Sequence, residues 1–200
     1  MTDTRVRKAL QVLNDGGVII YPTETVYGIG CLDYNNQGIE RIAKIKESGP
    51  EQSFIILVKD IGSIEFYCIE VPQFAYKLTQ RFWPGPLTIV LLAKESLHPR
   101  LIGSSGGVAL RQSPHPLTAQ LLRNLDAGLI STSANLSGHK APKSIEEIDL
   151  KISQSVDYIL NGDDLKGGVS TVIDLCSKEP KIIRHGAVST DDINECLSLK

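Results

Sequence analysis

Residues 17–31 read GVIIYPTETVYGIGC, a stretch that joins an apolar run to a dense series of small polar residues and glycines. Val18–Tyr21 is apolar and mostly β-branched, which indicates a buried strand. Pro22 ends this run, and the hydroxyl and carboxyl side chains of Thr23-Glu24-Thr25 follow it. Because ligands of open α/β sheets lie beyond the carboxyl ends of strands, this polar segment is a candidate binding site.

Helical and strand-like patterns alternate along the rest of the chain. Apolar spacing and capping residues predict helices around Val6–Leu13, Gln37–Lys46 and Gln73–Phe82, and helices that begin near Pro116, Ser144 and Ser189. Short apolar runs predict strands at Phe54–Val58, Leu87–Ala93, Val108–Leu110, Gly128–Ile130, Tyr158–Leu160, Thr171–Leu175 and Lys181–Arg184. The alternation predicts a single α/β domain over residues 1–200, with one twisted, mixed parallel and antiparallel sheet and flanking helices.

Composition narrows the class of protein. The 200 residues carry a net charge of −2, which argues against a broadly basic nucleic-acid binder. The four cysteines form no CxxC pair, and buried reduced thiols suit a cytoplasmic protein. The N-terminal segment lacks the features of a signal peptide, and no apolar run reaches the ~18 residues needed to cross a bilayer.

Further polar residues follow other predicted strands. Arg111 follows Val108–Leu110, Ser131–Asn135 follows Leu129-Ile130, and Arg184 ends the last predicted strand. Five small or polar residues in a row, as in Ser131–Asn135, suit the close approach of a ligand, although such residues also form turns that bond their own backbone. An arginine at a strand end either holds a phosphate or carboxylate with its forked donors or forms a structural ion pair.

Two other features have two interpretations each. Gly28 and Gly30 are either turn or bulge glycines, or they belong to the binding segment. Lys46 lies at a predicted helix end, where a lysine commonly offsets the helix dipole and stays solvated. The other interpretation of Lys46 is a catalytic role. Neither GxxxxGK[ST] nor GxGxxG is present, so the chain has no standard phosphate loop.

Five blocks of the sequence together resemble the YrdC/YciO family. In chain order they are GVIIYPTETVYGIG, WPGPLTIVL, VALRQSPHP, LISTSANLSG and STVIDL…IIRHGA, and they cover nearly the whole chain. The resemblance implies a concave ligand cleft and a minimal single-domain member without an additional C-terminal domain. It also implies L-threonylcarbamoyladenylate synthase activity, in which L-threonine, bicarbonate or CO₂, and ATP with Mg²⁺ give threonylcarbamoyl-AMP and pyrophosphate. Partner proteins would then use this product to modify tRNA, and family members also bind double-stranded RNA.

The resemblance also implies roles for individual residues. Lys46 matches the lysine of the family's K-x-R motif and is the candidate catalytic residue, while Ser133 and Asn135 match its S-x-N motif. Thr23, Tyr27 and Arg111 are implied to bind threonine. The implied nucleotide-binding residues are Ser131, Ser133, Asn135, Ser170 and Arg184. No metal held by protein side chains is implied.

The K-x-R motif is incomplete, because position 48 is serine. Serine cannot replace the forked donors of an arginine. Around Lys46–Phe54 the chain resembles the YciO branch more closely. The alternative function is therefore a non-catalytic YciO-like protein that binds nucleotide or double-stranded RNA. RNA binding requires several cations to converge on one face, namely Lys44, Lys46, Arg111, Lys140, Lys143 and Arg184.

Overall fold

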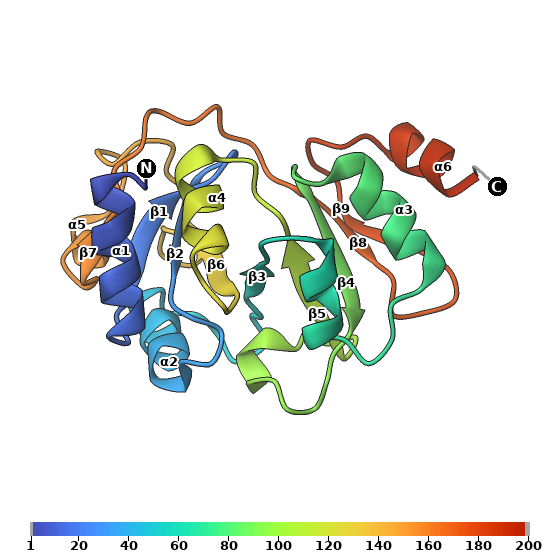
Figure 1. The fold of residues 1–200 in the computed structure, drawn as a ribbon, viewed down its shortest axis with the longest axis horizontal. Coiled ribbons are helices and arrows are strands. Elements are labelled where there is room, and N and C mark those ends of the chain that lie inside the picture. The colour runs from blue at the N-terminus through green and yellow to red at the C-terminus, as the bar shows by residue number, and fades with distance from the viewer. Residues whose placement is uncertain (1, 199–200) are drawn as a thin grey trace.

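A computed structural model describes residues 2–198 of the chain, and residues 1, 199 and 200 lie outside the described part. These residues form one mixed sheet of strand order β7-β1-β2-β6-β3-β5-β4-β8-β9 (Figure 1). The strands are β1 (Ile19–Pro22), β2 (Tyr27–Gly30), β3 (Ile55–Leu57), β4 (Leu87–Leu92), β5 (Gly107–Arg111), β6 (Leu129–Ser133), β7 (Tyr158–Ile159), β8 (Thr171–Asp174) and β9 (Lys181–Arg184). Parallel and antiparallel pairs alternate irregularly, which confirms the predicted mixed α/β sheet.

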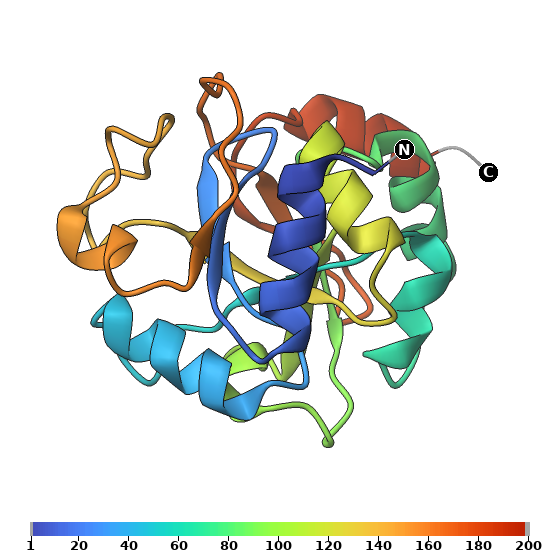
Figure 2. The same ribbon diagram turned by 60° about the vertical axis from the view of Figure 1, so that its left-hand side comes forward.

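Helices flank this sheet. They are α1 (Thr4–Asn14), α2 (Asn36–Ile45), α3 (Gln73–Phe82), α4 (Pro116–Arg123), α5 (Leu150–Ser153) and α6 (Thr190–Ser198), with 3₁₀ segments η1 (Ile61–Phe66) and η2 (Pro99–Leu101). Helices α1 and α4 pack side by side, as Figure 2 shows, and α3 packs against α6. None of the helices within residues 2–198 combines the length and the apolar character that a membrane crossing requires.

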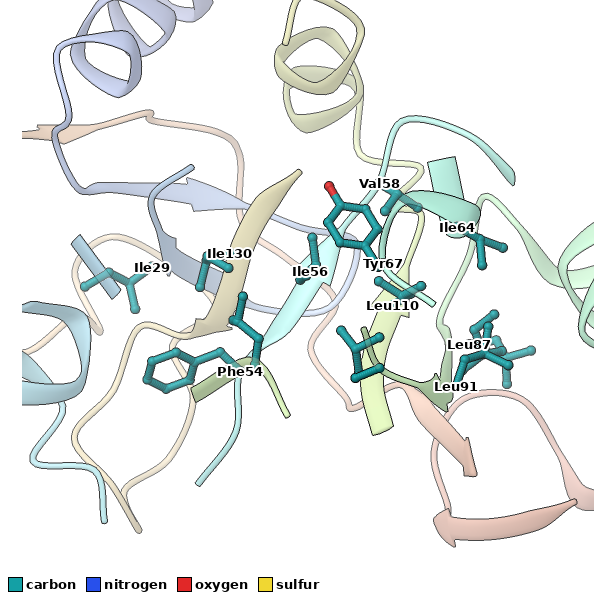
Figure 3. Close-up of a cluster of buried hydrophobic side chains, with 14 of the residues drawn as sticks. Ile29, Phe54, Ile56, Val58, Ile64, Tyr67, Leu87, Leu91, Leu110 and Ile130 are labelled. Atoms are coloured by element: carbon teal, nitrogen blue, oxygen red, sulfur yellow. The ribbon is translucent and has the colours of Figure 1, made fainter. Parts of the chain in front are cut away.

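Side chains on the two faces of the sheet enter two separate apolar clusters. Ile19 joins the cluster under α1 and α4, whereas its neighbour Ile20 joins the larger cluster on the other face, because successive side chains of a strand point to opposite faces. Ile130, Ile56 and Leu110 belong to the larger cluster and come from the neighbouring strands β6, β3 and β5 (Figure 3). The sheet is thus buried on both faces over most of its width.

The opening stretch folds as a hairpin, because Tyr27–Gly30 returns as strand β2 and pairs antiparallel with β1. Strand β2 is absent from the strands predicted from the sequence. Its glycines make room for Tyr21, which donates a hydrogen bond from its hydroxyl to the Ile130 carbonyl at 2.9 Å. A Cβ atom at Gly28 would lie 3.3 Å from the Tyr21 ring, and one at Gly30 would lie 1.8 Å from the Ile130 oxygen. Close packing therefore explains both glycines.

Strand β6 joins the two halves of the sheet. Its first residues pair with β3, Leu129 opposite Leu57 and Ser131 opposite Ile55, while Thr132 and Ser133 pair with β2. Ser131–Ser133 therefore form the end of β6, which lies between β2 and β3.

One predicted helix is wrong. No helix begins at Ser144; α5 begins only at Leu150, and the Asp149 side chain caps it by accepting from the Lys151 amide. The Glu147 carboxylate instead accepts from the Lys143 amide at 2.8 Å, so it cannot complete the predicted capping box with Ser144. By contrast, the capping pair predicted at Ser189 and Asp192 is present before α6.

Candidate functional site

A pocket of about 250 Å³ lies where the β1–β2 turn, the end of β6, and the arginines of β5 and β9 meet. Six of the nine predicted site residues line it: Thr23, Arg111, Ser131, Ser133, Ser170 and Arg184. The three others, Lys46, Tyr27 and Asn135, lie outside its lining. The sheet has thus brought together residues up to 161 positions apart in the sequence, from Thr23 to Arg184.

The β1–β2 turn forms one wall of the pocket. The Thr23 hydroxyl donates to the Val26 carbonyl at 2.7 Å and accepts from the Thr25 and Val26 amides, each at 3.2 Å. These bonds fix the turn, and the Thr23 side chain is almost fully buried. Thr23 therefore both closes the hairpin and lines the pocket with its neighbours.

The segment after β6 is held from behind by Lys46. This lysine follows α2, is only 1% exposed, and donates from Nζ to the carbonyls of Ser133 and Asn135, the second at 2.6 Å. Burial lowers the pKa of its ammonium group to about 8. The interpretation of Lys46 as a solvated residue at a helix end is wrong. Its contacts make it a residue that positions the end of β6, one layer behind the pocket.

Asn135 also acts on the backbone near β6. Its Nδ2 donates to the carbonyls of Leu136 at 2.7 Å and His139 at 2.8 Å, which orders the turn that follows. Its Oδ1 is buried without a hydrogen-bond partner within residues 2–198. The turn-forming interpretation of this segment therefore holds for Asn135, while Ser131 and Ser133 face the pocket.

Arg111 ends β5 and lies in a loose ion pair with Glu24. The Arg111 Nη1 atom is 3.6 Å from the Glu24 Oε1 atom, and both side chains are largely buried. The Glu24 Oε2 atom accepts from the Ser113 hydroxyl at 2.6 Å, whereas Oε1 and the Arg111 Nε atom are buried without hydrogen-bond partners in the described residues. The structural ion pair is thus present but leaves donor capacity in Arg111 unused.

Arg184 supplies the second cation of the pocket. Its Nε donates to the Ser170 carbonyl at 3.0 Å and its Nη2 to the Ser170 hydroxyl at 2.8 Å. Thr88 bonds the same hydroxyl at 2.8 Å and so fixes Ser170 from β4. Burial, and then the positive charge of Arg111, lower the pKa of Arg184. The two guanidinium groups therefore repel each other across the pocket, and an anion between them would relieve that repulsion.

Tyr27 is directed elsewhere. Its hydroxyl donates to the Gly162 carbonyl at 2.9 Å and accepts from the Gly162 amide at 3.0 Å. Ser48, at the position of the missing arginine, has a buried Oγ atom without a partner within residues 2–198, and it does not line the pocket. Sequence reasoning did not assign Gln52 and Ser53 to the site, although both line it; their position just before a predicted strand gave no functional signal.

Titratable side chains of the described residues form no metal site. No group of three or more His, Cys, Asp or Glu side chains within residues 2–198 is arranged to hold a metal ion. The pocket lining consists of neutral side chains and two arginines. It is therefore suited to anionic ligands held by hydrogen bonds and by positive charge.

Known proteins are similar to this chain over most of its length. The family model Sua5_yciO_yrdC, described as "Telomere recombination", matches residues 11–186. A "Threonylcarbamoyl-AMP synthase" of Pyrococcus abyssi is 32% identical over 96% of this chain, and the chain spans 57% of that relative's length. A protein of the same name from Nitrosococcus oceani is 36% identical over 79% of this chain and 85% of its own length.

Solved structures of related proteins superpose on the same domain. P. abyssi Sua5 complexed with L-threonine superposes with a TM-score of 0.89 at 29% identity, covering 96% of this chain and 57% of that one. Escherichia coli YciO superposes with a TM-score of 0.85 at 28% identity, covering 94% of this chain and 92% of that one. The order of the motifs, the mixed sheet and these matches lead to one conclusion: the chain belongs to the Sua5/YciO/YrdC family.

Proposed function

We propose that this chain is an L-threonylcarbamoyladenylate synthase. The observation that carries the proposal is the pair Arg111 and Arg184, whose like charges face one pocket lined by short neutral side chains. Relatives named threonylcarbamoyl-AMP synthase and a Sua5 structure complexed with L-threonine support it. The reaction combines threonine, bicarbonate and ATP, and all three bring negative charge to the site.

The chemistry needs positioning rather than a covalent nucleophile. The threonine amine adds to CO₂ derived from bicarbonate, with loss of water, and gives a carbamate. A carbamate oxygen then attacks the α-phosphorus of ATP, and the bond to the β-phosphate oxygen breaks to release pyrophosphate. Holding the anionic reactants together supplies most of the catalysis in such a step. ATP enters as its magnesium complex, with the ion carried on the phosphate oxygens.

We assign the two ends of the pocket to different substrates. Arg111, with unused donors beside the β1–β2 turn, binds the threonine carboxylate. Arg184, fixed by Ser170, binds the phosphate chain. Ser131 and Ser133 line the same pocket from β6 and bond the reacting groups, while Lys46 holds the carbonyls of Ser133 and Asn135 in place. A pocket of about 250 Å³ holds the reacting groups, and the remainder of the nucleotide extends over its open side.

The test is threonine-dependent and bicarbonate-dependent release of pyrophosphate from magnesium-ATP, with threonylcarbamoyl-AMP identified by mass spectrometry. Serine is the matched control substrate, because the pocket gains only ~1–3 kcal/mol from the extra methyl group of threonine. Failure to form threonylcarbamoyl-AMP at saturating substrate concentrations contradicts the proposal. In the proposed function, threonylcarbamoyl-AMP passes to partner proteins that modify tRNA.

A non-catalytic, YciO-like nucleotide-binding role is the second candidate. Ser48 favours it, because this position lacks the arginine of K-x-R, and so does the likeness to E. coli YciO. Calorimetry separates the candidates: a synthase binds ATP and threonine together, whereas the alternative binds ATP and ignores threonine. Two of the six cations expected to bind RNA are not accessible to it, because Lys46 and Arg111 are only 1% and 5% exposed.

A further inference from the structure

A second and larger cleft, of about 650 Å³, lies at the other end of β6. Gly128, directly before β6, lines it, whereas Ser133 at the far end of the strand lines the candidate active site. The walls of this cleft come from connecting segments that follow β2 and β3, from η1, and from the loops before η2 and β6. Neither cleft shares a lining residue with the other.

Two exposed aromatic side chains line this second cleft. Tyr34 is 68% exposed and Phe66 is 72% exposed, and both line it. Exposed aromatic side chains that lie together in a cleft mark an interaction surface rather than an ordinary solvated face.

The charges around this cleft are mainly acidic. Asp33 and Asp126 line it, and Glu65 directly precedes the lining residue Phe66 in the chain. The Asp33 side chain is held in place, because its Oδ2 accepts from the Tyr67 hydroxyl and from the Gly128 amide at 3.1 Å.

Two lysines oppose these acids. Lys59 lines the cleft, and Lys94 donates from Nζ to the backbone carbonyl of Glu65 at 2.7 Å. Among the lining side chains, two aspartates therefore stand against one lysine and the imidazole of His98. A polyanion such as RNA is disfavoured at this surface, because phosphate binding requires an excess of cations.

We propose that this second cleft docks a basic segment of a partner protein. The segment places one apolar side chain against Tyr34 and Phe66, and a lysine or arginine against Asp33 and Asp126. Aromatic side chains beside a pocket are typical anchors of protein interfaces, and complementary charge speeds and orients the encounter. Because the docking cleft and the candidate active site share no residues, the proposal stands independently of the proposed function.

The probe is a phage-displayed library of random peptides of about twelve residues, selected on the full chain and then measured as synthetic peptides by fluorescence anisotropy. We expect the enriched peptides to carry one large apolar residue flanked by lysine or arginine. Phe66→Ser or Asp126→Lys should weaken their binding by about tenfold or more. Rising salt should weaken it further, because part of the attraction is electrostatic.

The matched control is Leu150→Ser, which removes an equally exposed apolar side chain, 73% accessible, from α5. It should leave peptide binding unchanged, and all three variants should unfold at the wild-type temperature because the altered side chains contribute little to the core. The proposal is overturned if the selected peptides bind wild type and Phe66→Ser equally, if they lack basic residues, or if ATP and threonine displace them.

Discussion

The two ends of β6 carry opposite chemistry. At the Ser133 end, small hydroxyl side chains and two arginines surround a pocket of about 250 Å³. At the Gly128 end, exposed aromatic rings and two aspartates surround a cleft of about 650 Å³. One five-residue strand thus separates a site suited to anions from a surface suited to cations.

This difference teaches how one sheet supports two kinds of recognition. The anion pocket is built from strand ends and one tight turn, and buried bonds such as those of Lys46 and Ser170 fix its residues. The acidic cleft is built from connecting segments whose aromatic side chains remain exposed. Rigid placement suits a reaction, and exposed side chains suit docking.

The largest effect is expected where β2 holds β6 in place between the two clefts. Gly30→Ala should lower the free energy of unfolding by about 4 kcal/mol or more, because the new Cβ would meet the Ile130 oxygen at 1.8 Å. Gly28→Ala is the control and should cost about 1 kcal/mol, since its nearest contacts are at 3.3 Å. Urea denaturation measures both, and equal losses would show that β6 does not depend on this contact.

Removing Arg111 tests the anion-binding end. Arg111→Ala should reduce kcat/KM for threonylcarbamoyl-AMP formation by about 100-fold to 1,000-fold, because a preorganised cation is lost. The variant also leaves Glu24 buried and unpaired, so its stability should fall. The double variant Arg111→Ala/Glu24→Gln should recover stability but not activity. Arg123→Ala is the control outside the pocket and should behave as wild type. Recovery of activity in the double variant would show that Arg111 does not bind substrate.

Ser170→Ala separates the nucleotide end from the threonine end. The Ser170 hydroxyl accepts from Arg184, and such a charge-assisted bond is worth about 1.5 kcal/mol, or roughly tenfold in affinity. The KM for ATP should therefore rise by about tenfold while the KM for threonine stays constant. Steady-state kinetics with each substrate varied in turn provide the measurement, and an equal rise in both KM values would contradict the assignment of the two ends.

Lys46 gives an effect confined to alkaline pH, in the pH dependence of stability. Burial lowers its pKa to about 8 from 10.5, so the unfolded chain binds more protons between these values. The free energy of unfolding should therefore rise with pH in this window, by at most about 1.4 kcal/mol per pH unit from this group. Lys46→Met should lack this slope, so the free energy of unfolding of wild type minus that of the variant should rise with pH between about 8 and 10.5. Identical profiles would mean that Lys46 keeps an ordinary pKa in the fold.

Most of the sheet could be predicted from the sequence, because apolar runs such as Phe54–Val58 and Leu87–Ala93 are long enough to indicate buried strands. Strand β2 could not, since its glycines lack strand propensity and are explained only by tertiary contacts with the Tyr21 ring and the Ile130 carbonyl. The false helix at Ser144 shows the converse error: a local capping pattern was present, but Glu147 bonds a backbone amide outside any helix.

For the candidate site, the motif residues at strand ends were predictable and their neighbours were not. Thr23, Arg111 and Ser133 follow apolar runs, so their convergence at one pocket follows from the topology of the sheet. The burial of Lys46 depends on where α2 ends relative to β6, which no local pattern reveals. The acidic cleft depends on several connecting segments, none of which carries a motif.

Tyr21 crosses β2 to reach Ile130, with its ring packed over Gly28 and Gly30. Positions 21, 28 and 30 consequently form one unit of sequence change. A methyl group at position 28 would meet the Tyr21 ring at 3.3 Å and require only a small shift, whereas position 30 admits no side chain while the Ile130 carbonyl lies beside it. A larger side chain at position 28 should therefore require a smaller one at position 21, while position 30 keeps its glycine.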